Sequence, residues 1–432
     1  MPFEMPTARD PVLSLLQSAA ARLSRLDGHG PGPHPLVQAV DSLVSHAQGS
    51  TAPQGHVSLP SLTCGRLGLQ LLQARLAGDM EQVQTLNDRL AFSACDPRWA
   101  ETLIDYAATL QPDGQPRAIP YIRHAALSDF VVAAATPSLR IGLISDWGTG
   151  TASAHTVAAQ LATHRPDMVI HLGDIYFAGT TEECEINFLA PLRAVLPGTR
   201  LFSLCGNHDV YSGGDGYYGL LQRIGQPASY FCLRSPDLSW QILAADTGLH
   251  DRDPFDEAGS VTRLEPAEQA WHADKLRAFP GRTVFLSHHQ PFSAFSRIGR
   301  AADHDPTNPN LMATHAILAG SGRIDAWFWG HEHALRLYAP YRGVAAGRNI
   351  GNGAIPVAAA DDLSLAGLVD PPTLGARPPI DLVDGAYAHG FALLDLSPDG
   401  IEASYWIASR PAAPIHRERL GPQPVAGQAP GA

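Results

Sequence analysis

The chain has 432 residues, of which 45% are hydrophobic and 17% are charged, and its formal net charge at pH 7 is -12. This composition is that of a globular protein with a sizeable core, and it excludes an intrinsically disordered chain. The acidic charge disfavours non-specific binding of nucleic acid, because such binding depends on Lys and Arg replacing counterions along the phosphate backbone.

The hydropathy of the chain indicates neither secretion nor membrane insertion. An acidic residue, Glu4, stands where a signal peptide carries a basic segment, and no run of about eighteen apolar residues occurs. The 5 cysteines are odd in number and have no CxxC spacing, which argues against a disulfide scaffold and against a structural zinc site. We therefore expect a cytoplasmic protein with no membrane partner.

The first part of the chain, residues 1–125, is expected to form an α-helical region. Apolar residues recur there at helical spacing, most clearly between Leu67 and Leu76, and segments rich in Pro and Gly separate the periodic stretches. The role of this region and the oligomeric state of the protein do not follow from the sequence.

The pattern changes at Leu139, where short apolar runs begin to alternate with helical stretches. This alternation predicts an α/β domain over residues 139–409, with helices packed on sheet. The expected strands are residues 139–145, 168–172, 201–204, 240–245, 283–287 and 326–329, followed by an antiparallel pair, 391–396 and 401–407, around a Pro-Asp-Gly turn. From Arg410 to Ala432 Pro, Gly and Ala predominate, so we expect a flexible tail.

Polar side chains follow five of these strands at the points where the strands end. They are Asp146 in SDWG, Asp174 in GD, Asn207 in GNHD, His288 in SHHQP, and His331 and His333 in GHEH. Ligands of an open α/β sheet gather outside the carboxyl ends of its strands. The sequence therefore predicts one site with oxygen and nitrogen donors, a set that suits iron, manganese or zinc.

Two metal ions in this site would fit the hydrolysis of a phosphoester. The substrate is anionic and repels an attacking hydroxide, and its alkoxide is a poor leaving group. Two cations about 3.5–4 Å apart generate the hydroxide, neutralise the phosphoryl oxygens and stabilise the in-line transition state. A carboxylate between the ions can bridge both, and we assign this position to Asp174.

In this order along the chain, SDWG, GD, GNHD, HH and GHEH resemble the motifs of the calcineurin-like metallophosphoesterases. SDWG is similar to the GDWG block of the purple acid phosphatase branch. The resemblance covers about residues 139–407 and implies a four-layer α/β/β/α sandwich of two mixed sheets. It implies a first metal bound by Asp146, Asp174 and His333, and a second metal bound by Asp174, Asn207, His288 and His331.

The resemblance also implies a catalytic pair in GNHD. His208 would contact the phosphate or protonate the leaving group, and Asp209 would orient the imidazole of His208. His289 competes with His288 as a metal ligand, and we favour His288 because it is the first residue past its strand.

One position departs from the purple branch, which has a tyrosinate three residues after the second Asp. Here that position is Phe177, and Tyr176 stands one residue earlier. Neighbouring side chains of an extended segment point to opposite sides, so Tyr176 becomes a ligand only if the loop bulges. We expect water in place of this ligand and, as a consequence, no ferric chromophore.

Other residues are candidates for the substrate pocket. Tyr211 and Tyr217 lie in a Gly-rich segment directly after GNHD, which could fold over the site. Asn352 lies in an NIGNG segment that could bring backbone N–H groups near the metals.

The expected activity is the hydrolysis of a phosphomonoester or phosphodiester by a hydroxide that bridges two metal ions, iron with manganese or zinc. The partner would be a small phosphorylated substrate. One alternative is a nuclease on the same fold, which the acidic charge disfavours. Another is a non-catalytic binding module, against which stand His208 and the nearly complete set of expected ligands.

Overall fold

The computed structural model describes residues 78–80, 82, 96, 98–111, 115–254, 260–293, 298, 305–357, 371–374, 381–383 and 386–421. Most of the expected N-terminal helical region, including the periodic segment from Leu67 to Leu76, lies outside these ranges. Helix α5, Arg98–Thr109, lies within them. None of the helices in the described ranges is long and apolar enough to cross a membrane.

A six-stranded sheet contains the first three predicted strands of the α/β region. Its strands are β2 (Leu139–Ile144), β3 (Met168–His171), β4 (Arg200–Ser203), β13 (Gly390–Ser397), β14 (Gly400–Ile407) and β15 (His416–Leu420). They lie in the order β15-β14-β13-β2-β3-β4. β2, β3 and β4 are parallel, whereas β13 is antiparallel to β2. The sheet is therefore mixed.

A seven-stranded sheet contains the predicted strands 240–245, 283–287 and 326–329, whereas the predicted antiparallel pair is β13 and β14 of the first sheet. The strands of the second sheet are β1 (Val131–Ala133), β5 (Phe231–Arg234), β6 (Trp240–Ala244), β7 (Arg282–Leu286), β8 (Ala326–Trp329), β9 (Leu335–Leu337) and β10 (Gly347–Ile350). Their order is β1-β5-β6-β7-β8-β10-β9, with parallel pairs from β6 to β10 and an antiparallel edge strand, β9. The expected α/β fold with two mixed sheets is confirmed. A separate hairpin pairs β11 (Leu382–Val383) with β12 (Ala386–Tyr387).

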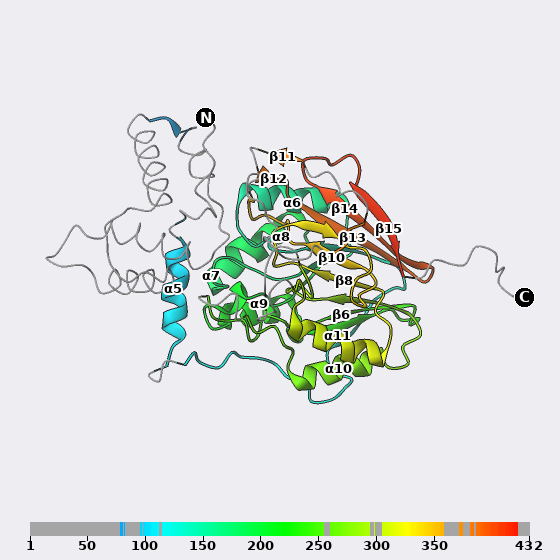
Figure 1. Cartoon of the computed structure of the whole chain (residues 1–432). Coiled ribbons are helices and arrows are strands. Elements are labelled where there is room, and N and C mark those ends of the chain that lie inside the picture. The colour runs from blue at the N-terminus through cyan, green and yellow to red at the C-terminus, as the bar shows by residue number, and fades with distance from the viewer. Residues whose placement is uncertain are drawn as a thin grey trace, which may run out of the picture.

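Three apolar clusters hold the layers together, and Figure 1 shows how the strands and helices of these layers are arranged. One cluster lies between the sheets and includes Ile141 and Leu143 of β2 with Ile242 of β6 and Val284 of β7. Alternate residues of the strands point to opposite faces, so both sheets also bury an outer face. Besides α5, the α- and π-helices of the described residues are α6 (Ala152–Thr163), α7 (Thr181–Glu183), a π-helix (Cys184–Leu189), α8 (Ala190–Val195), α9 (Asp215–Ile224), α10 (Pro266–Leu276) and α11 (Pro309–Ser321).

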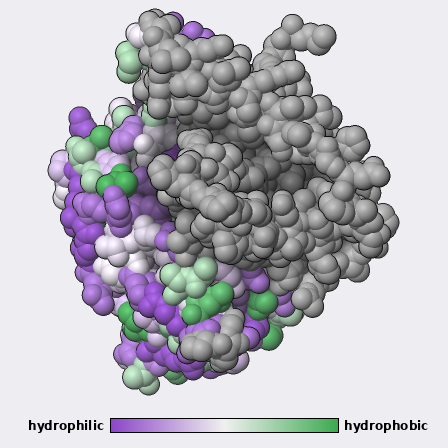
Figure 2. Space-filling view, turned by 90° about the vertical axis from the view of Figure 1, so that its left-hand side faces the viewer, coloured by the Kyte–Doolittle hydropathy of each residue, from purple (hydrophilic) through white to green (hydrophobic). Residues whose placement is uncertain are grey.

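The outer faces are covered by different helices. Helices α6 and α8 with the π-helix pack on the six-stranded sheet, where Leu161 and Phe188 join Val169 in one cluster. Helices α10 and α11 pack on the seven-stranded sheet, where Trp271 and Leu311 lie in a third cluster. Figure 2 shows a different kind of surface, where hydrophobic residues of the described part are scattered among hydrophilic ones, as on a solvated exterior.

Part of the expected flexible tail, residues 410–432, forms a strand, and the residues after Gly421 lie outside the described ranges. His416–Leu420 form β15, which pairs with β14 along its whole length. Arg417 and Arg419 of this edge strand are exposed, whereas Leu420 is buried. Charged side chains are usual on edge strands, because they discourage pairing with another chain. Composition alone therefore misses a strand whose order depends on a partner distant in sequence.

A buried ion pair fixes β15 to the rest of the fold. Arg348, which is 2% exposed, donates from Nε to Glu418 Oε1 at 2.6 Å, and the Tyr405 hydroxyl donates to the same oxygen at 2.7 Å. Although burial by itself raises the pKa of Glu418, the hydrogen bonds from Arg348 and Tyr405 hold it below its usual value. The pair therefore links the two sheets, because Arg348 belongs to β10.

We predict that Glu418→Ala lowers the free energy of unfolding by about 3 kcal/mol, since it leaves the Arg348 charge buried without a counterion. Denaturant unfolding measures the loss. The matched control is Glu402→Ala on the exposed face of β14, for which a change below about 0.5 kcal/mol is expected. Equal losses in the two variants would contradict a stabilising role for the buried pair.

Candidate metal centre

The carboxyl ends of five parallel strands, three from one sheet and two from the other, meet at one place. Backbone hydrogen bonds join the loops that follow these strands. The Asp146 N–H donates to the Gly173 carbonyl at 3.1 Å, and the Gly330 N–H donates to the His288 carbonyl at 2.9 Å. The His331 N–H donates to Asp146 Oδ2 at 3.0 Å and so joins the two sheets. The fold thus brings together the six residues that the sequence predicts as metal ligands.

One group of donor atoms surrounds the hydroxyl of Tyr176. This oxygen lies 3.3 Å from Asp146 Oδ1, 3.1 Å from Asp174 Oδ2 and 3.0 Å from His333 Nε2. Tyr176 is completely buried, whereas the His333 side chain keeps 23% of its surface exposed. This first group therefore has two carboxylates, a phenol and an imidazole, and it opens to solvent beside His333.

A second group surrounds the amide oxygen of Asn207. Asn207 Oδ1 lies 3.2 Å from His288 Nε2 and 3.0 Å from His331 Nδ1, and the two imidazole nitrogens lie 3.3 Å apart. Asp174 Oδ1 lies 3.4 Å from His288 Nε2. Ligand atoms about 2.1 Å from a shared ion are separated by about 3.0–3.4 Å in octahedral or tetrahedral arrangements. The spacing in this group fits such an ion.

The orientation of each donor in the second group is fixed by a contact on its other side. His288 Nδ1 lies 2.8 Å from the Leu172 carbonyl, so Nδ1 carries the proton and Nε2 presents its lone pair to the site. Asn207 Nδ2 donates to the Tyr211 hydroxyl at 2.6 Å, which leaves Oδ1 directed at the two imidazoles. Both residues are therefore held ready to bind a cation.

Three of the candidate ligands have left-handed backbone conformations. The φ angles of Asp146, Asp174 and His331 are 52°, 75° and 65°. Such conformations cost of the order of 1–3 kcal/mol each in non-Gly residues and gather at functional sites. Gly206 lies against Asp174 so closely that a Cβ there would collide with the carboxylate. The backbone is therefore shaped to point these side chains at one another.

The interactions among the charged groups of the cluster favour the binding of a cation. Burial raises the pKa of Asp146 to about 7, although His288 opposes this. Burial alone would lower the pKa of His288, but Asp174 and Asp146 raise it to about 9. A proton on His288 thus neutralises part of the carboxylate charge. A metal ion could replace that proton and leave His288 as a neutral ligand.

His208 lies beside the first group and is 6% exposed. Its Nδ1 lies 2.7 Å from the Phe177 carbonyl, and its backbone N–H donates to Asp174 Oδ1 at 3.1 Å. Its ring lies 4.4 Å from the Tyr176 ring, between centroids. The predicted catalytic histidine therefore adjoins the centre, and a backbone carbonyl sets the orientation of its imidazole.

Asp209 does not contact His208, so the predicted orienting pair is wrong. Its carboxylate instead accepts from the backbone N–H groups of Asp174 at 3.0 Å, Ile175 at 3.1 Å and Gly206 at 2.8 Å. The reason is local, because His208 and Asp209 belong to a 3-10 turn, His208–Val210, in which neighbouring side chains point about 120° apart. Burial and then Asp174 raise the pKa of Asp209 to about 8.

Tyr176 lies in the centre, contrary to the expected direction of its side chain. Its backbone N–H donates to the Gly148 carbonyl at 2.8 Å, and the side chain of Ile175 packs in the outer core. Neighbouring side chains do point to opposite sides, but Tyr176 is the one that faces the donors. Burial and then Asp174 and Asp146 raise the pKa of Tyr176 well above its usual value. A tyrosinate at this position therefore requires a cation.

His289 lies behind the ligands and not among them. Its Nδ1 lies 3.0 Å from Thr247 Oγ1, and its Nε2 lies 2.9 Å from Asp251 Oδ2. The ring packs 4.6 Å from the ring of His331, between centroids. His288, His289 and His331 could geometrically hold one ion, but both nitrogens of His289 already have partners. This arrangement supports His288 as the ligand.

The three candidates for the substrate pocket have other contacts. Tyr211 is buried and holds Asn207, as described above. Tyr217 is completely buried and donates to the Ser203 carbonyl at 2.8 Å, so its assignment to the pocket is wrong. Its position on the inner side of α9 explains this, because α9 begins sooner after GNHD than the Gly-rich sequence indicates. Asn352 is buried and donates from Nδ2 to the Ala388 carbonyl at 3.4 Å.

His389 is a residue near the centre that the sequence motifs do not identify. It lies directly before β13, whose first residues are opposite the carboxyl end of β2. Its charge contributes to lowering the pKa of His333, although burial is the larger cause and brings that pKa to about 4. The only sequence signal is a histidine before a strand, which is too common to be informative.

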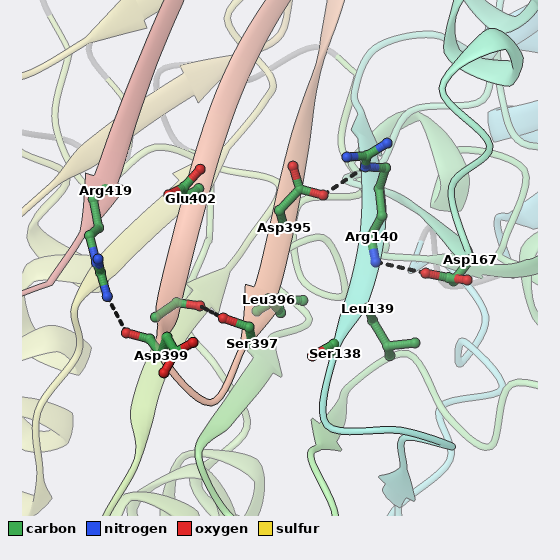
Figure 3. A pocket seen from close by; sticks show the side chains of 11 residues that line it. Ser138, Leu139, Arg140, Asp167, Asp395, Leu396, Ser397, Asp399, Glu402 and Arg419 are labelled. Atoms are coloured by element: carbon green, nitrogen blue, oxygen red, sulfur yellow. Dashed lines mark hydrogen bonds and ion pairs between the residues drawn. The ribbon is translucent and has the colours of Figure 1, made fainter.

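A surface pocket of about 570 Å³ lies far from these residues, at the opposite end of β2 (Figure 3). Its charged side chains are paired across neighbouring strands. Arg140 Nε donates to Asp395 Oδ1 at 2.6 Å, and the Arg140 N–H donates to Asp167 Oδ2 at 2.7 Å. The site predicted from the motifs is at the other end of the sheet.

The comparison with protein-family models agrees with the motifs. Residues 139–335 match the family model described as calcineurin-like phosphoesterase. No curated protein sequence matches the chain. The solved structures that resemble it include GAP50, the anchor in the inner membrane complex of Plasmodium, at 12% identity over 67% of this chain and 90% of that chain, with a TM-score of 0.47.

Two further solved structures show similarly low identities. A purple acid phosphatase from yellow lupin (Lupinus luteus) seeds is 15% identical over 64% of this chain and 53% of that chain, with a TM-score of 0.43. A metallophosphoesterase from Sphaerobacter thermophilus is 15% identical over 61% and 84% of the two chains, with a TM-score of 0.23.

The position of the Tyr176 hydroxyl reverses the expectation about colour. We predict that the protein loaded with ferric iron shows a visible charge-transfer band and that Tyr176→Phe abolishes the band, because the variant lacks the phenolate oxygen. Absorption spectra at equal iron content test this. Tyr217→Phe is the control, since its buried hydroxyl donates to the Ser203 carbonyl. A band of full intensity in Tyr176→Phe would show that the phenol is not a ligand.

Proposed function

We propose that this chain, whose residues 139–335 match the calcineurin-like phosphoesterase family model, hydrolyses phosphomonoesters or phosphodiesters at a centre of two metal ions. The observation that carries the proposal is the position of Asp174. Its Oδ2 faces the group around Tyr176, and its Oδ1 faces the group that contains His288. One carboxylate thus lies between two sets of donors, as a bridging ligand must.

The donor atoms divide into one set for each ion. The first ion would be held by Asp146, Asp174, Tyr176 and His333, and the second by Asp174, Asn207, His288 and His331. All of these donors are oxygen or nitrogen, a set that suits iron together with manganese or zinc. Once bound, the two cations would supply an attacking hydroxide at neutral pH and neutralise the phosphoryl oxygens.

The chain itself contributes a proton-transfer group at one edge of this centre. Because Nδ1 of His208 lies against the Phe177 carbonyl, that nitrogen keeps its proton, and Nε2 is the atom that gains or loses one. A protonated His208 can therefore donate from Nε2 to the oxygen of the leaving group. The hydrogen bond from its backbone N–H to Asp174 fixes the position of His208 relative to the proposed bridging carboxylate.

Asp209 has a supporting part in this proposal. Its three backbone hydrogen bonds hold the loop of Asp174 against the loop of Gly206, and so they set the distance between the proposed bridge and Asn207. This replaces the direct action on His208 that the sequence predicts.

Two measurements test the proposed function as a whole. Metal analysis of the purified protein should give close to two ions per chain, and a panel of aryl phosphate monoesters, aryl phosphate diesters and nucleotides should include substrates. Absence of both metal and turnover would favour the non-catalytic module. A DNA complex that dissociates with added salt, together with strand cleavage, would favour the nuclease.

The bridging role of Asp174 predicts unequal losses of metal. Asp174→Ala should bind fewer ions than Asp146→Ala, because it deprives both ions of a ligand. The two variants are well matched, since both wild-type residues are buried and have positive φ angles. Metal-to-protein ratios after dialysis decide the question. Equal ratios in the two variants would exclude Asp174 as the bridge.

The role of His208 predicts a dependence on the leaving group. His208→Ala should keep near-normal metal content but lose about 10²–10⁴-fold in turnover of an alkyl phosphate, whose leaving group needs a proton. The loss should be much smaller for a nitrophenyl ester, whose leaving group departs without one. Steady-state rates on both substrates, with metal content measured in parallel, provide the comparison.

Other outcomes for His208 are equally informative. Loss of the metals in His208→Ala would place the residue among the ligands. Equal slowing on both substrates, with the metals retained, would make His208 an electrostatic contact to the phosphoryl oxygens. A suitable control is His155→Ala, which replaces an exposed histidine on α6.

A further inference from the structure

An arginine from outside the matched domain lies next to the catalytic loop. Arg98 is the first residue of α5, and the central carbon of its guanidinium lies 4.6 Å from the centroid of the Phe177 ring. Figure 1 shows the corresponding proximity of α5 and α7, the helix that follows the Phe177 loop. A cation over an aromatic face is attracted by the ring electrons. The N-terminal region thus reaches the loop that carries Tyr176.

Asp96 holds this guanidinium in a fixed orientation. Arg98 Nε donates to Asp96 Oδ1 at 3.0 Å, and Nη2 donates to Oδ2 at 2.6 Å, in a two-pronged ion pair. Asp96 Oδ1 also accepts from the Arg98 backbone N–H at 3.0 Å and so caps the start of α5. The Asp96 side chain is 3% exposed, whereas the Arg98 side chain is 40% exposed. The carboxylate is therefore buried beneath a cation that still meets solvent.

The position of this cation relative to the chemistry follows from Phe177. The carbonyl of Phe177 accepts from His208 Nδ1, and the residue before it, Tyr176, reaches the first donor group. Phe177 is itself 3% exposed, and Arg98 packs on its ring. Arg98 is therefore near the proposed leaving-group side of the centre, but it is not among the metal ligands.

A cation at this position would favour the binding of an anionic substrate to an acidic protein. A formal charge of -12 repels a multiply charged substrate, so a fixed positive group beside the centre lowers that barrier locally. A guanidinium suits phosphate and carboxylate because its planar N–H donors match their oxygens. Its prior fixation by Asp96 reduces the loss of side-chain entropy on binding.

We propose that Arg98 binds a second anionic group of the substrate, and that the preferred substrates are phosphoesters with another phosphate or a carboxylate on the leaving group. The inference rests on the proposed function, because it takes the scissile phosphate to lie at the metal centre. It assigns a role in substrate selection to a residue of the N-terminal region.

Equilibrium binding tests the inference without turnover. Methylphosphonate and a series of alkane bisphosphonates of increasing chain length would be titrated by calorimetry into the metal-loaded protein. We expect at least one bisphosphonate to bind about fivefold more tightly than methylphosphonate, and Arg98→Ala to abolish that preference. Arg98→Lys should keep part of it, since Lys retains the charge but not the flat two-pronged pair with Asp96.

The matched control is Arg140→Ala. Arg140 also makes a 2.6 Å ion pair, with Asp395, and its side chain is 43% exposed, but it lies at the opposite end of β2 (Figure 3). Its removal should leave the preference for bisphosphonates intact. A general loss of charge would lower the preference in both variants, whereas specific binding lowers it only in the Arg98 variants.

Steady-state kinetics provide a second test of the inference, with an alkyl phosphate and the corresponding alkanediol bisphosphate as substrates. The ratio of their kcat/KM values should fall about fivefold in Arg98→Ala, mainly through KM. If Arg98→Ala lowers kcat/KM equally for both substrates, or weakens the binding of methylphosphonate and of the bisphosphonates equally, the inference is wrong. Arg98 then only anchors α5. A wild-type protein without any preference for the second anion would also overturn it. Selective binding of bisphosphonates without hydrolysis would support Arg98 and refute the proposed function.

Discussion

A buried carboxylate between two sets of donor atoms is the constraint on which the rest of the structure depends. Asp174 is 1% exposed, and its neighbours include two further buried carboxyl groups, Asp146 and Asp209. Removing such charges from water costs several kcal/mol per ion unless hydrogen bonds and opposite charges compensate. The His208 N–H and the imidazole of His288 supply part of this compensation. The remaining negative charge makes the cluster a candidate site for metal ions.

The two sheets bring the ends of their strands so close together that some positions in the loops cannot hold a side chain. Glycine at positions 206 and 330 removes the Cβ atoms that would collide with Asp174 and Ser145. Left-handed conformations at Asp146, Asp174 and His331 then turn the side chains inward. These conformations are unfavourable by themselves, and the hydrogen bonds between the loops hold them in place. The core between the sheets provides the rigid support that such a backbone needs.

The segment before the sheets is also connected to the site. Arg98 packs on Phe177 at one end of it, and Tyr121 donates to Glu268 at 2.9 Å at the other. Between them, Ile119 packs against the cluster of Val210, Tyr217 and Tyr218, next to the loop of Asn207. The segment thus touches loops on two sides of the centre. A family domain over residues 139–335 therefore does not contain every residue that shapes this site.

From the sequence alone, the α/β class and six residues of the candidate site could be predicted. Each motif follows an apolar run, and parallel strands place their carboxyl ends together, so Asp146, Asp174, Asn207, His288, His331 and His333 could be predicted as neighbours. The sequence did not determine β15, because the order of an edge strand depends on Arg348, which is distant along the chain. It also gave no indication of the position of His389, for which no local pattern exists.

Only the tertiary structure decided where individual side chains point. Tyr176 faces the donor atoms because the hydrogen bond from its backbone N–H to the Gly148 carbonyl fixes the orientation of its loop. The alternation of side chains along an extended segment does not by itself say which of two neighbouring residues faces the site. Asp209 binds three backbone N–H groups because a 3-10 turn directs it away from His208. Tyr217 enters the core because α9 begins directly after the loop. Local sequence restricts which residues are near the site, whereas packing and hydrogen bonds between distant segments select the atoms that meet there.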